Sequence, residues 1–433
     1  MILAMRHASK KRFLTGMAAA FGCWSAFAAS PWIQGTTDKC PLDYVVGEEI
    51  TFTLKVREAA SLPPGSRLRW ERTGDDGMLR KGEAGVDSSL VVNTSLNRSG
   101  FVRLYAEVLG ADGNPWQSDD AKGRKDRVFF DGGAAVEPRR LRQTKPEPAD
   151  FDAFWAKRKA ELAAVPMKAT LEEISSPVQG VRLFKVSVAC AGGHPSTGYL
   201  SVPATEGRYP AIVGFHGYNA SWGRNATNPP RKVPEKAIQL LVSAHGFELG
   251  REASYYLDFR KSTCSNGYGH AFDPAQNSRP ETCYFGGMAW RVMRGIEYVK
   301  SRPEWNGRDL TVTGGSQGSL QAIWGAALVP GVTAAKIYIP WCCDIGGTED
   351  GRNHGEWYLK WAPGLDYYDQ VNMARRVPGT CRVDISRVGL GDYIAPPCGV
   401  AMMFNNLSCP KSIVWVQGST HGYVPPEPQR VKW

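Results

Sequence analysis

The segment 314–318, Gly-Gly-Ser-Gln-Gly, lies between two different kinds of local sequence. An apolar run of strand character, residues 310–313, comes before it, and an Ala/Leu-rich run of helical character, residues 317–328, comes after it. Strand, Gly-x-Ser-x-Gly and helix in this order are typical of a nucleophile elbow, a sharp turn that raises one serine hydroxyl above the edge of a sheet. Glycines are needed there because a Cβ would clash with the adjoining strand and helix. We therefore predict an α/β fold with Ser316 as a nucleophile; an ordinary glycine-rich loop is the alternative.

A nucleophilic serine needs a general base, and the chain has seven histidines. In hydrolases with this elbow the chain order is nucleophile, acid, histidine. The base is therefore expected after Ser316, where only His354 and His421 lie. His421 stands in a Gly/Ser/Thr turn after an apolar run, residues 413–416, and open α/β sheets place their chemistry at such strand ends. No strand-like run precedes His354, which favours a surface position, so His421 is the predicted base.

The orienting acid is expected between the nucleophile and the base, again directly after a strand. Apolar residues alternate over residues 383–390, and Asp392 follows them. Asp392 is therefore the favoured carboxylate, which would hold the imidazole in its productive tautomer; capping of a turn is its alternative role. The rival acid is Asp344, which follows the strand-like run 337–341. That run comes directly after the elbow helix, one unit earlier than this fold usually places its acid.

An acyl-transfer reaction also needs N–H donors for the oxyanion. This fold takes one from the residue after the nucleophile and one from the loop after an earlier strand. The first would be Gln317. The second would come from Tyr218 or its neighbour, because the buried-strand pattern of residues 210–215 leads directly into a His-Gly-Tyr-Asn segment. His216, in the same segment, is interpreted as a residue that shapes the loop.

Four motifs together resemble the acetyl xylan esterase/cephalosporin-C deacetylase family. They are the elbow, Gly-Tyr at 217–218, Phe-Asp-Ala-Phe-Trp at 151–155, and Gly-Asp at 391–392 before two prolines. The resemblance covers residues 145–425, and it implies an α/β hydrolase that removes acetyl groups from carbohydrate hydroxyls.

The resemblance implies the site already inferred from the residues: nucleophile Ser316, acid Asp392, base His421, and oxyanion donors Tyr218 and Gln317. The chain departs from the family in three places. The elbow is followed by Ser where the family usually has Gly, the histidine by Gly where it usually has Glu, and Ala-His-Gly-Phe-Glu replaces the Arg-Gly-Gln motif. These departures concern the substrate and the oligomeric packing more than hydrolysis.

We expect a serine carbohydrate esterase that removes acetyl groups from acetylated xylan or oligosaccharides through an acyl-enzyme. A serine peptidase or another short-chain ester hydrolase of this fold is one alternative, and a non-catalytic polysaccharide-binding protein is another. Trp222 and Trp341 are candidate walls of the substrate pocket, with a core position as the alternative for each. The long segment 248–283 has little periodicity and is a further candidate wall.

The chain is expected to have two domains. Residues 1–28 have the basic cluster, apolar stretch and small-x-small end of a secretory signal, so the protein should be secreted or periplasmic. Residues 29–137 contain short alternating runs between turns, which predict a small immunoglobulin-like β-sandwich that docks on the hydrolase or binds carbohydrate. A Pro-containing linker, residues 138–150, leads to residues 151–433, where strand and helix signals alternate as in a mostly parallel sheet covered on both faces.

Composition excludes several classes of partner and cofactor. The net charge of +10 falls to about +6 without the signal and is spread over the chain, so no nucleic-acid binding is expected. No apolar run of the mature sequence is long enough to span a membrane. No Cys/His spacing suggests zinc, and we predict no metal or cofactor.

The cysteines are expected to pair in part. Signal cleavage would leave nine, an odd number, so at least one would be free in an exported chain. Cys264 and Cys283 bracket a loop-like insertion, and Cys381, Cys398 and Cys409 surround the segment of the predicted acid. The adjacent pair at 342–343 is expected to be buried thiols.

Overall fold

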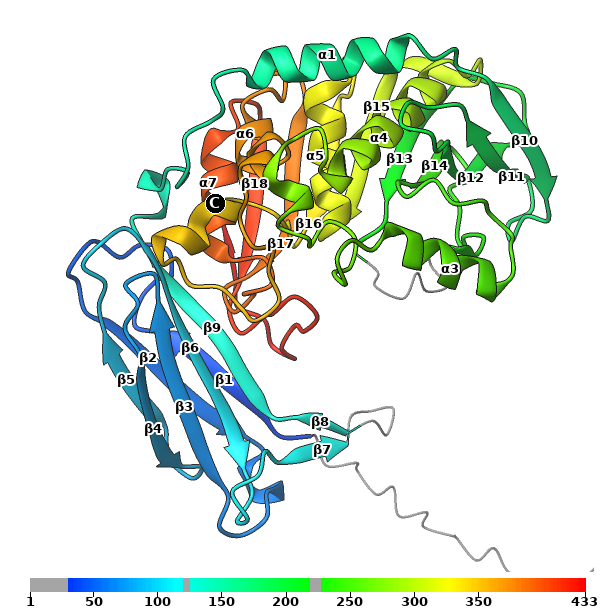
Figure 1. Ribbon diagram of the computed structural model, residues 1–433. Coiled ribbons are helices and arrows are strands. Elements are labelled where there is room, and N and C mark those ends of the chain that lie inside the picture. The colour runs from blue at the N-terminus through cyan, green and yellow to red at the C-terminus, as the bar shows by residue number, and fades with distance from the viewer. Residues whose placement is uncertain (1–29, 120–124, 219–226) are drawn as a thin grey trace, which may run out of the picture.

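The computed structural model describes residues 30–119, 125–218 and 227–433. Two regions differ in architecture (Figure 1). The first, which we call the N-terminal β-region, consists of the described residues up to 136 and contains strands, turns and the short 3-10 helix η1 (Ala59–Ser61). The second contains a large sheet with helices. The predicted signal segment and Trp222 lie outside the described residues.

The N-terminal β-region consists of two antiparallel sheets that share one apolar core. The strand over residues 50–57 lies where alternation of apolar and polar residues predicts it, with its apolar face buried. One sheet has the order β1 (Trp32–Thr37), β2 (Ile50–Arg57) and β5 (Leu90–Thr94). The other has the order β4 (Arg80–Gly85), β3 (Arg67–Gly74), β6 (Gly100–Leu109) and β9 (Phe129–Val136). A ribbon of β7 (Gln117–Asp119) and β8 (Lys125–Arg127) adjoins them.

The second region is built on one ten-stranded sheet. In order across the sheet the strands are β10 (Ala169–Ile174), β11 (Val181–Val188), β12 (Ser196–Pro203), β14 (Ile238–Ser243), β13 (Tyr209–Phe215), β15 (Trp305–Gly315), β16 (Ala334–Tyr338), β17 (Arg382–Gly389), β18 (Lys411–Val416) and β19 (Arg430–Lys432). The pairings from β14 to β18 are parallel, and those at both ends are antiparallel. The sheet is therefore mixed rather than mostly parallel.

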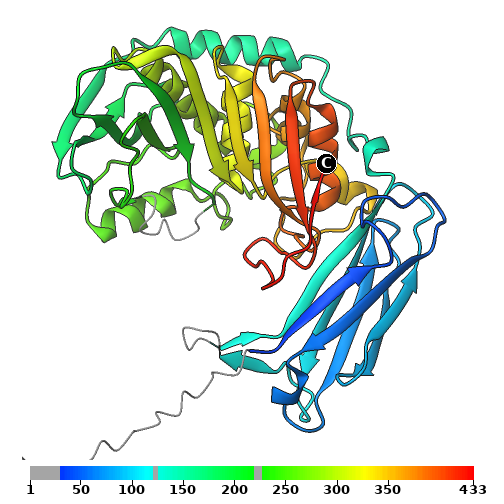
Figure 2. The ribbon, with the colours of Figure 1, turned by 180° about the vertical axis from the view of Figure 1, so that it is seen from behind.

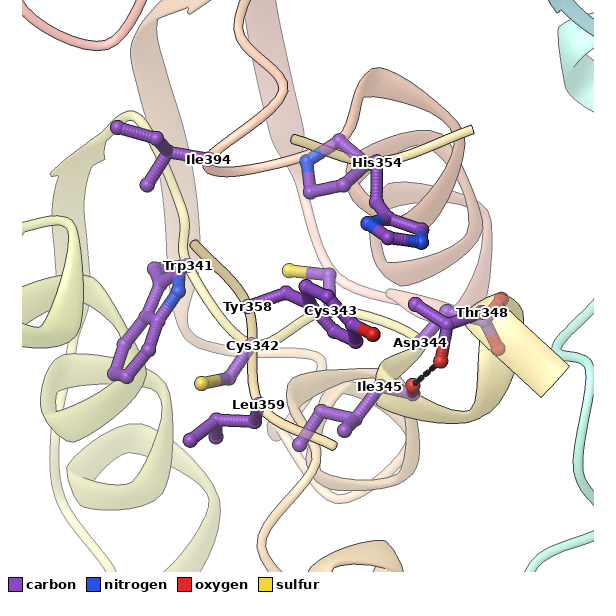
Figure 3. Close-up of a pocket in the computed structure, with 11 residues that line it drawn as sticks. Trp341, Cys342, Cys343, Asp344, Ile345, Thr348, His354, Tyr358, Leu359 and Ile394 are labelled. Atoms are coloured by element: carbon purple, nitrogen blue, oxygen red, sulfur yellow. Dashed lines mark hydrogen bonds between the residues drawn. The ribbon is translucent and has the colours of Figure 1, made fainter. Parts of the chain in front are cut away.

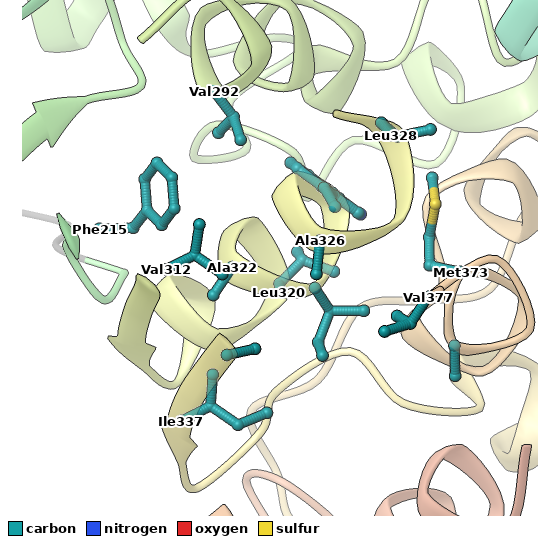
Figure 4. Packing of buried hydrophobic residues seen from close by; sticks show 14 of the residues in the cluster. Phe215, Val292, Val312, Leu320, Ala322, Ala326, Leu328, Ile337, Met373 and Val377 are labelled. Atoms are coloured by element: carbon teal, nitrogen blue, oxygen red, sulfur yellow. The ribbon is translucent and has the colours of Figure 1, made fainter. Parts of the chain in front are cut away.

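The helices that pack on this sheet form a single layer. They are α1 (Phe151–Ala163), α4 (Tyr284–Lys300), α5 (Gln317–Leu328), α6 (Gln370–Ala374) and α7 (Pro397–Asn406). Each contacts the next in a continuous row, and α5 lies at the centre, where strand and helix side chains meet (Figure 4). A further helix, α3 (Ala253–Thr263), lies inside the segment expected to have little periodicity.

The opposite face of the central strands has no helix among the described residues (Figures 1 and 2). In β16, Ala335 and Ile337 point into the core, whereas Lys336 and Tyr338 are exposed. The prediction of a sheet covered on both faces is therefore wrong. Alternating burial of this kind is the mark of a strand with one solvated face.

Candidate active site

Ser316 occupies the turn between β15 and α5, with φ 56° and ψ −123°. A non-glycine residue in this conformation is strained and persists only where the surrounding structure fixes it. The flanking glycines permit the turn: a Cβ on Gly314 would lie 2.5 Å from the backbone of Gly318, and one on Gly318 would lie 2.4 Å from the Phe215 carbonyl oxygen. The predicted elbow and its helix, residues 317–328, are confirmed.

Ser316, His421 and Asp392 form a continuous chain of hydrogen-bonding groups. His421 Nε2 lies 2.9 Å from Ser316 Oγ, and His421 Nδ1 lies 2.9 and 3.1 Å from the two oxygens of Asp392. Asp392 is fully buried, and its Oδ1 also accepts the N–H of Ala395 at 3.0 Å. This geometry fits a serine nucleophile, a histidine base and a carboxylate that fixes the imidazole tautomer.

Adjacent strands bring the predicted acid and the predicted base together. Strands β17 and β18 pair in parallel, and each leads at its carboxyl end into one of two loops: the acid loop, residues 391–393, and the histidine loop, residues 417–421. The N–H of Gly391 donates to the Ser419 carbonyl at 3.1 Å, which connects the two loops directly. Arg387 donates to the carbonyl of His421 at 3.1 Å.

The two rival residues lie elsewhere. Asp344 accepts the N–H of Thr144 at 2.8 Å and its hydroxyl at 2.6 Å, and burial raises the pKa of the Asp344 carboxyl. It makes no hydrogen bond to His421. His354 has its Nδ1 2.7 Å from the Gly355 carbonyl and its ring against Tyr358. Both line a small pocket together with Trp341 (Figure 3).

The predicted oxyanion segment approaches the nucleophile closely. A Cβ on Gly217 would lie 3.7 Å from the Cβ of Ser316. The amide of Gln321, on the elbow helix, donates to the His216 carbonyl at 2.9 Å and to the Gln317 carbonyl at 3.1 Å, so one side chain links both predicted donor segments. Burial lowers the pKa of His216, which favours the neutral ring. The roles of Tyr218 and Gln317 as oxyanion donors stay predictions.

An aromatic cluster surrounds Tyr218. Its ring stacks on His270 at a centroid distance of 4.3 Å and lies 5.0 Å from Trp357 and 5.8 Å from Trp341. Burial lowers the pKa of His270 to about 3, so this ring is neutral. Trp341 is buried, and it stacks on the partly exposed Trp357 at 5.1 Å. Sequence reasoning missed Trp357 and His270, since neither follows a strand or belongs to a motif.

The remaining expectations concern disulfides, metal sites and membrane-spanning segments. All nine cysteines of the described residues are free thiols, so the expected disulfides are not found. Cys381, Cys398 and Cys409 are buried in the core. The described part of the chain holds no group of three His, Cys, Asp or Glu side chains arranged for a metal ion. Within the described ranges no helix has the length and apolar character to cross a membrane.

The strand–elbow–helix turn and the single central sheet define an α/β hydrolase. Two solved structures share the fold, the acetyl xylan esterase from Paenibacillus sp. R4 and acetyl xylan esterase 1 from Thermoanaerobacterium sp. JW/SL YS485. They are 22% and 23% identical to this chain, each with a TM-score of 0.54, and the similarity covers 67% of this chain and 94% of theirs.

The sequence comparisons identify the family. The acetyl xylan esterase (AXE1) family matches residues 137–433, and the chain belongs to this family of carboxylic-ester hydrolases. Acetyl esterase Axe7A of Xylanibacter ruminicola (strain ATCC 19189 / DSM 19721 / CIP 105475 / JCM 8958 / 23) is 26% identical over 290 residues. The aligned part spans 63% of this chain and 63% of that relative's length.

Proposed function

We propose that this chain is an exported serine carbohydrate esterase that removes acetyl groups from acetylated xylan or oligosaccharides. The observation that carries the proposal is the position of His421, whose two ring nitrogens lie 2.9 Å from Ser316 Oγ and from Asp392 Oδ2. Membership of the acetyl xylan esterase family supports a carbohydrate ester as the substrate.

The reaction would proceed in two halves. In the first, Ser316 Oγ attacks the acetyl carbonyl carbon while His421 Nε2 takes the hydroxyl proton, and Asp392 stabilises the imidazolium. Backbone N–H groups of Tyr218 and Gln317 would hold the oxyanion. The ester bond to the sugar then breaks, and His421 returns its proton to the sugar oxygen. In the second half, water deprotonated by His421 attacks the acetyl-enzyme and releases acetate.

The surroundings of the triad suit a small acyl group on a sugar. Neutral aromatic rings around Tyr218 provide apolar surface beside the predicted oxyanion segment. We infer a substrate wall formed by Trp341 and Trp357, with Trp222 as a further member outside the described residues. We also propose that the N-terminal β-region is an immunoglobulin-like domain, joined through the linker 138–150 and exported by a signal at residues 1–28.

The proposal is tested by acetate release from acetylated xylan, small acetylated sugars and longer-chain esters. Preference for acetylated carbohydrate is the expected result, and peptide cleavage without ester cleavage would favour the peptidase alternative. A fluorophosphonate probe should label Ser316 in the wild type and leave Ser316→Ala unlabelled. A folded protein that binds xylan but takes up no probe and releases no acetate would be a binding protein instead.

A further inference from the structure

The N-terminal β-region lies directly against the acid loop. A Cβ on Gly391 would lie 1.9 Å from the carbonyl oxygen of Asp131, a residue of strand β9. Only glycine permits so close an approach of two backbones. The residue just before the catalytic acid is thus in contact with the other region of the chain.

An ion pair of the N-terminal β-region, with a buried carboxylate and a partly exposed guanidinium, adjoins the same loop. Arg103 donates to both oxygens of Asp131, from Nε at 2.8 Å and from Nη2 at 2.6 Å. The Arg103 guanidinium also lies over the ring of Tyr393, 4.6 Å from its centroid. The acid loop is therefore contacted at both ends, by the Asp131 backbone at residue 391 and by Arg103 at residue 393.

The histidine loop has contacts with the same strand. The side-chain amide of Gln417 accepts the N–H of Gly133 and donates to its carbonyl, both at 2.9 Å. Beyond the loop, the Tyr423 ring lies 4.9 Å from that of Phe129. Strand β9 thus contacts the loop of the acid and the loop of the base at once, which fixes the two loops relative to each other.

We propose that Arg103 and Asp131 are positioning residues that hold Asp392 at hydrogen-bonding distance from His421. The proposal rests on the triad proposed above. Both residues precede residue 137, where the match to the acetyl xylan esterase family begins, so the N-terminal β-region supplies part of this site's support from outside the matched segment.

The ion pair also controls the charge beside the acid. The charged groups that face Asp131 are Arg103 and Asp392; burial raises the pKa of Asp131 to about 6, and the Asp392 carboxylate adds to that rise while Arg103 opposes it. Paired with Arg103, Asp131 adds no net charge next to Asp392. Without the guanidinium, the buried carboxylate of Asp131 would repel Asp392 or take up a proton, and the Tyr393 ring would lose its support.

The first test is Arg103→Gln, assayed with an activated acetyl ester. We expect kcat to fall by about 10- to 100-fold, since small displacements of catalytic groups have effects of this size, while KM changes less than about two-fold. The matched control is Arg98→Ala, which removes an ion pair that does join the two regions, to Asp350 at 2.8 Å, without contacting the acid loop. Its kcat should stay at the wild-type value.

The decisive measurement repeats Arg103→Gln in an Asp392→Asn background. A residue that acts through Asp392 should have little further effect there, less than about two-fold on the residual kcat, whereas a general folding defect would lower activity by the same factor in both backgrounds. Equal factors, or wild-type kcat in Arg103→Gln alone, would overturn the proposal.

A second variant covers the case in which Arg103→Gln does not fold. Arg103→Lys keeps the charge but loses the paired hydrogen bonds, so its kcat should lie between wild type and the loss expected for Arg103→Gln; an unchanged kcat would also overturn the proposal. Failure of the proposed function itself would look different. A wild-type enzyme without esterase activity, or an Asp392→Asn variant with the wild-type rate, would show that no such triad operates.

Discussion

Gly318 lies so close to Phe215 that a Cβ on the glycine would be 2.4 Å from the phenylalanine carbonyl oxygen. This contact joins the first turn of the elbow helix to the end of β13, the strand that leads to the predicted oxyanion segment. The spacing between Ser316 and the predicted oxyanion donors therefore depends on the absence of one side chain.

Substitution of Gly318 by Ala should displace the elbow, because the obstacle is backbone that cannot rotate away. We expect a loss of about 1–3 kcal/mol in the free energy of unfolding, the usual result of overpacking, together with a lower kcat. Gly315→Ala is the matched control: the three atoms nearest its Cβ all belong to the ring of Tyr338, which is 43% exposed and able to move. Thermal melts and ester assays should show a larger loss of stability and of kcat for Gly318→Ala than for Gly315→Ala. Equal losses in the two variants would contradict the prediction.

Removal of the proposed nucleophile should abolish catalysis without affecting the fold. Ser316→Ala deletes only a hydroxyl, and loss of a triad nucleophile lowers kcat by up to ~10⁶. Esterase kinetics and circular dichroism on the same preparation provide the measurement. A variant that keeps more than a tenth of the wild-type kcat would exclude Ser316 from the mechanism.

The candidate site could be predicted from the sequence because its residues directly follow strands. Residues 383–390 and 413–416 were predicted as the last two strands before the acid and the base, and β17 and β18 do pair side by side. Consecutive strands are usually neighbours, so the sequence alone predicts that Asp392 and His421 lie close together. The aromatic residues around Tyr218 could not be predicted in this way, because they come from loops whose sequences have no strand or helix periodicity.

The sequence already contained evidence against a sheet covered on both faces. Residues 383–390 alternate apolar with polar side chains, and β17 buries Val383 and Ile385 while its Asp384 and Ser386 are not buried. Such alternation indicates one solvated face, whereas strands covered on both faces are apolar throughout. The Arg103–Asp131 pair had no such signal, because it becomes part of the site only through contacts between distant segments.

Short acyl chains should be preferred if the proposed substrate class is correct. Each methylene that the pocket does not accommodate disfavours the reaction by roughly 1–3 kcal/mol. The kcat/KM for acetyl esters should therefore exceed that for butyryl and longer esters of the same alcohol. A series of 4-nitrophenyl esters measures this directly, and values that rise with chain length would indicate a lipase-like enzyme.

Asp366 should make stability depend on pH. Burial raises its pKa from 3.8 to about 6, opposed by the hydrogen bond that it accepts from Trp361 Nε1 at 2.9 Å. Because the folded state holds this proton more tightly than the unfolded state, its contribution is fully present below about pH 4 and is lost as pH rises through 6. Asp366→Asn keeps an acceptor for Trp361 and cannot titrate. The melting temperature of the wild type relative to this variant should fall between pH 4 and 7, and parallel profiles would contradict the assignment.

The two candidate acids can be separated by matched substitutions. Asp392→Asn should lower kcat by about 10⁴, because an amide can donate to His421 Nδ1 and so hold the imidazole in the wrong tautomer. Asp344→Asn should instead alter stability or substrate fit. The Asp344 carboxylate accepts two hydrogen bonds from Thr144 in the linker segment and makes none to the histidine. Melting curves establish that both variants are folded, and kcat for one acetyl ester then ranks them. If Asp344→Asn lost about 10⁴ while Asp392→Asn stayed near wild type, the hydrogen bonds at 2.9 and 3.1 Å between His421 and Asp392 would have no catalytic role, and Asp344 would be the acid.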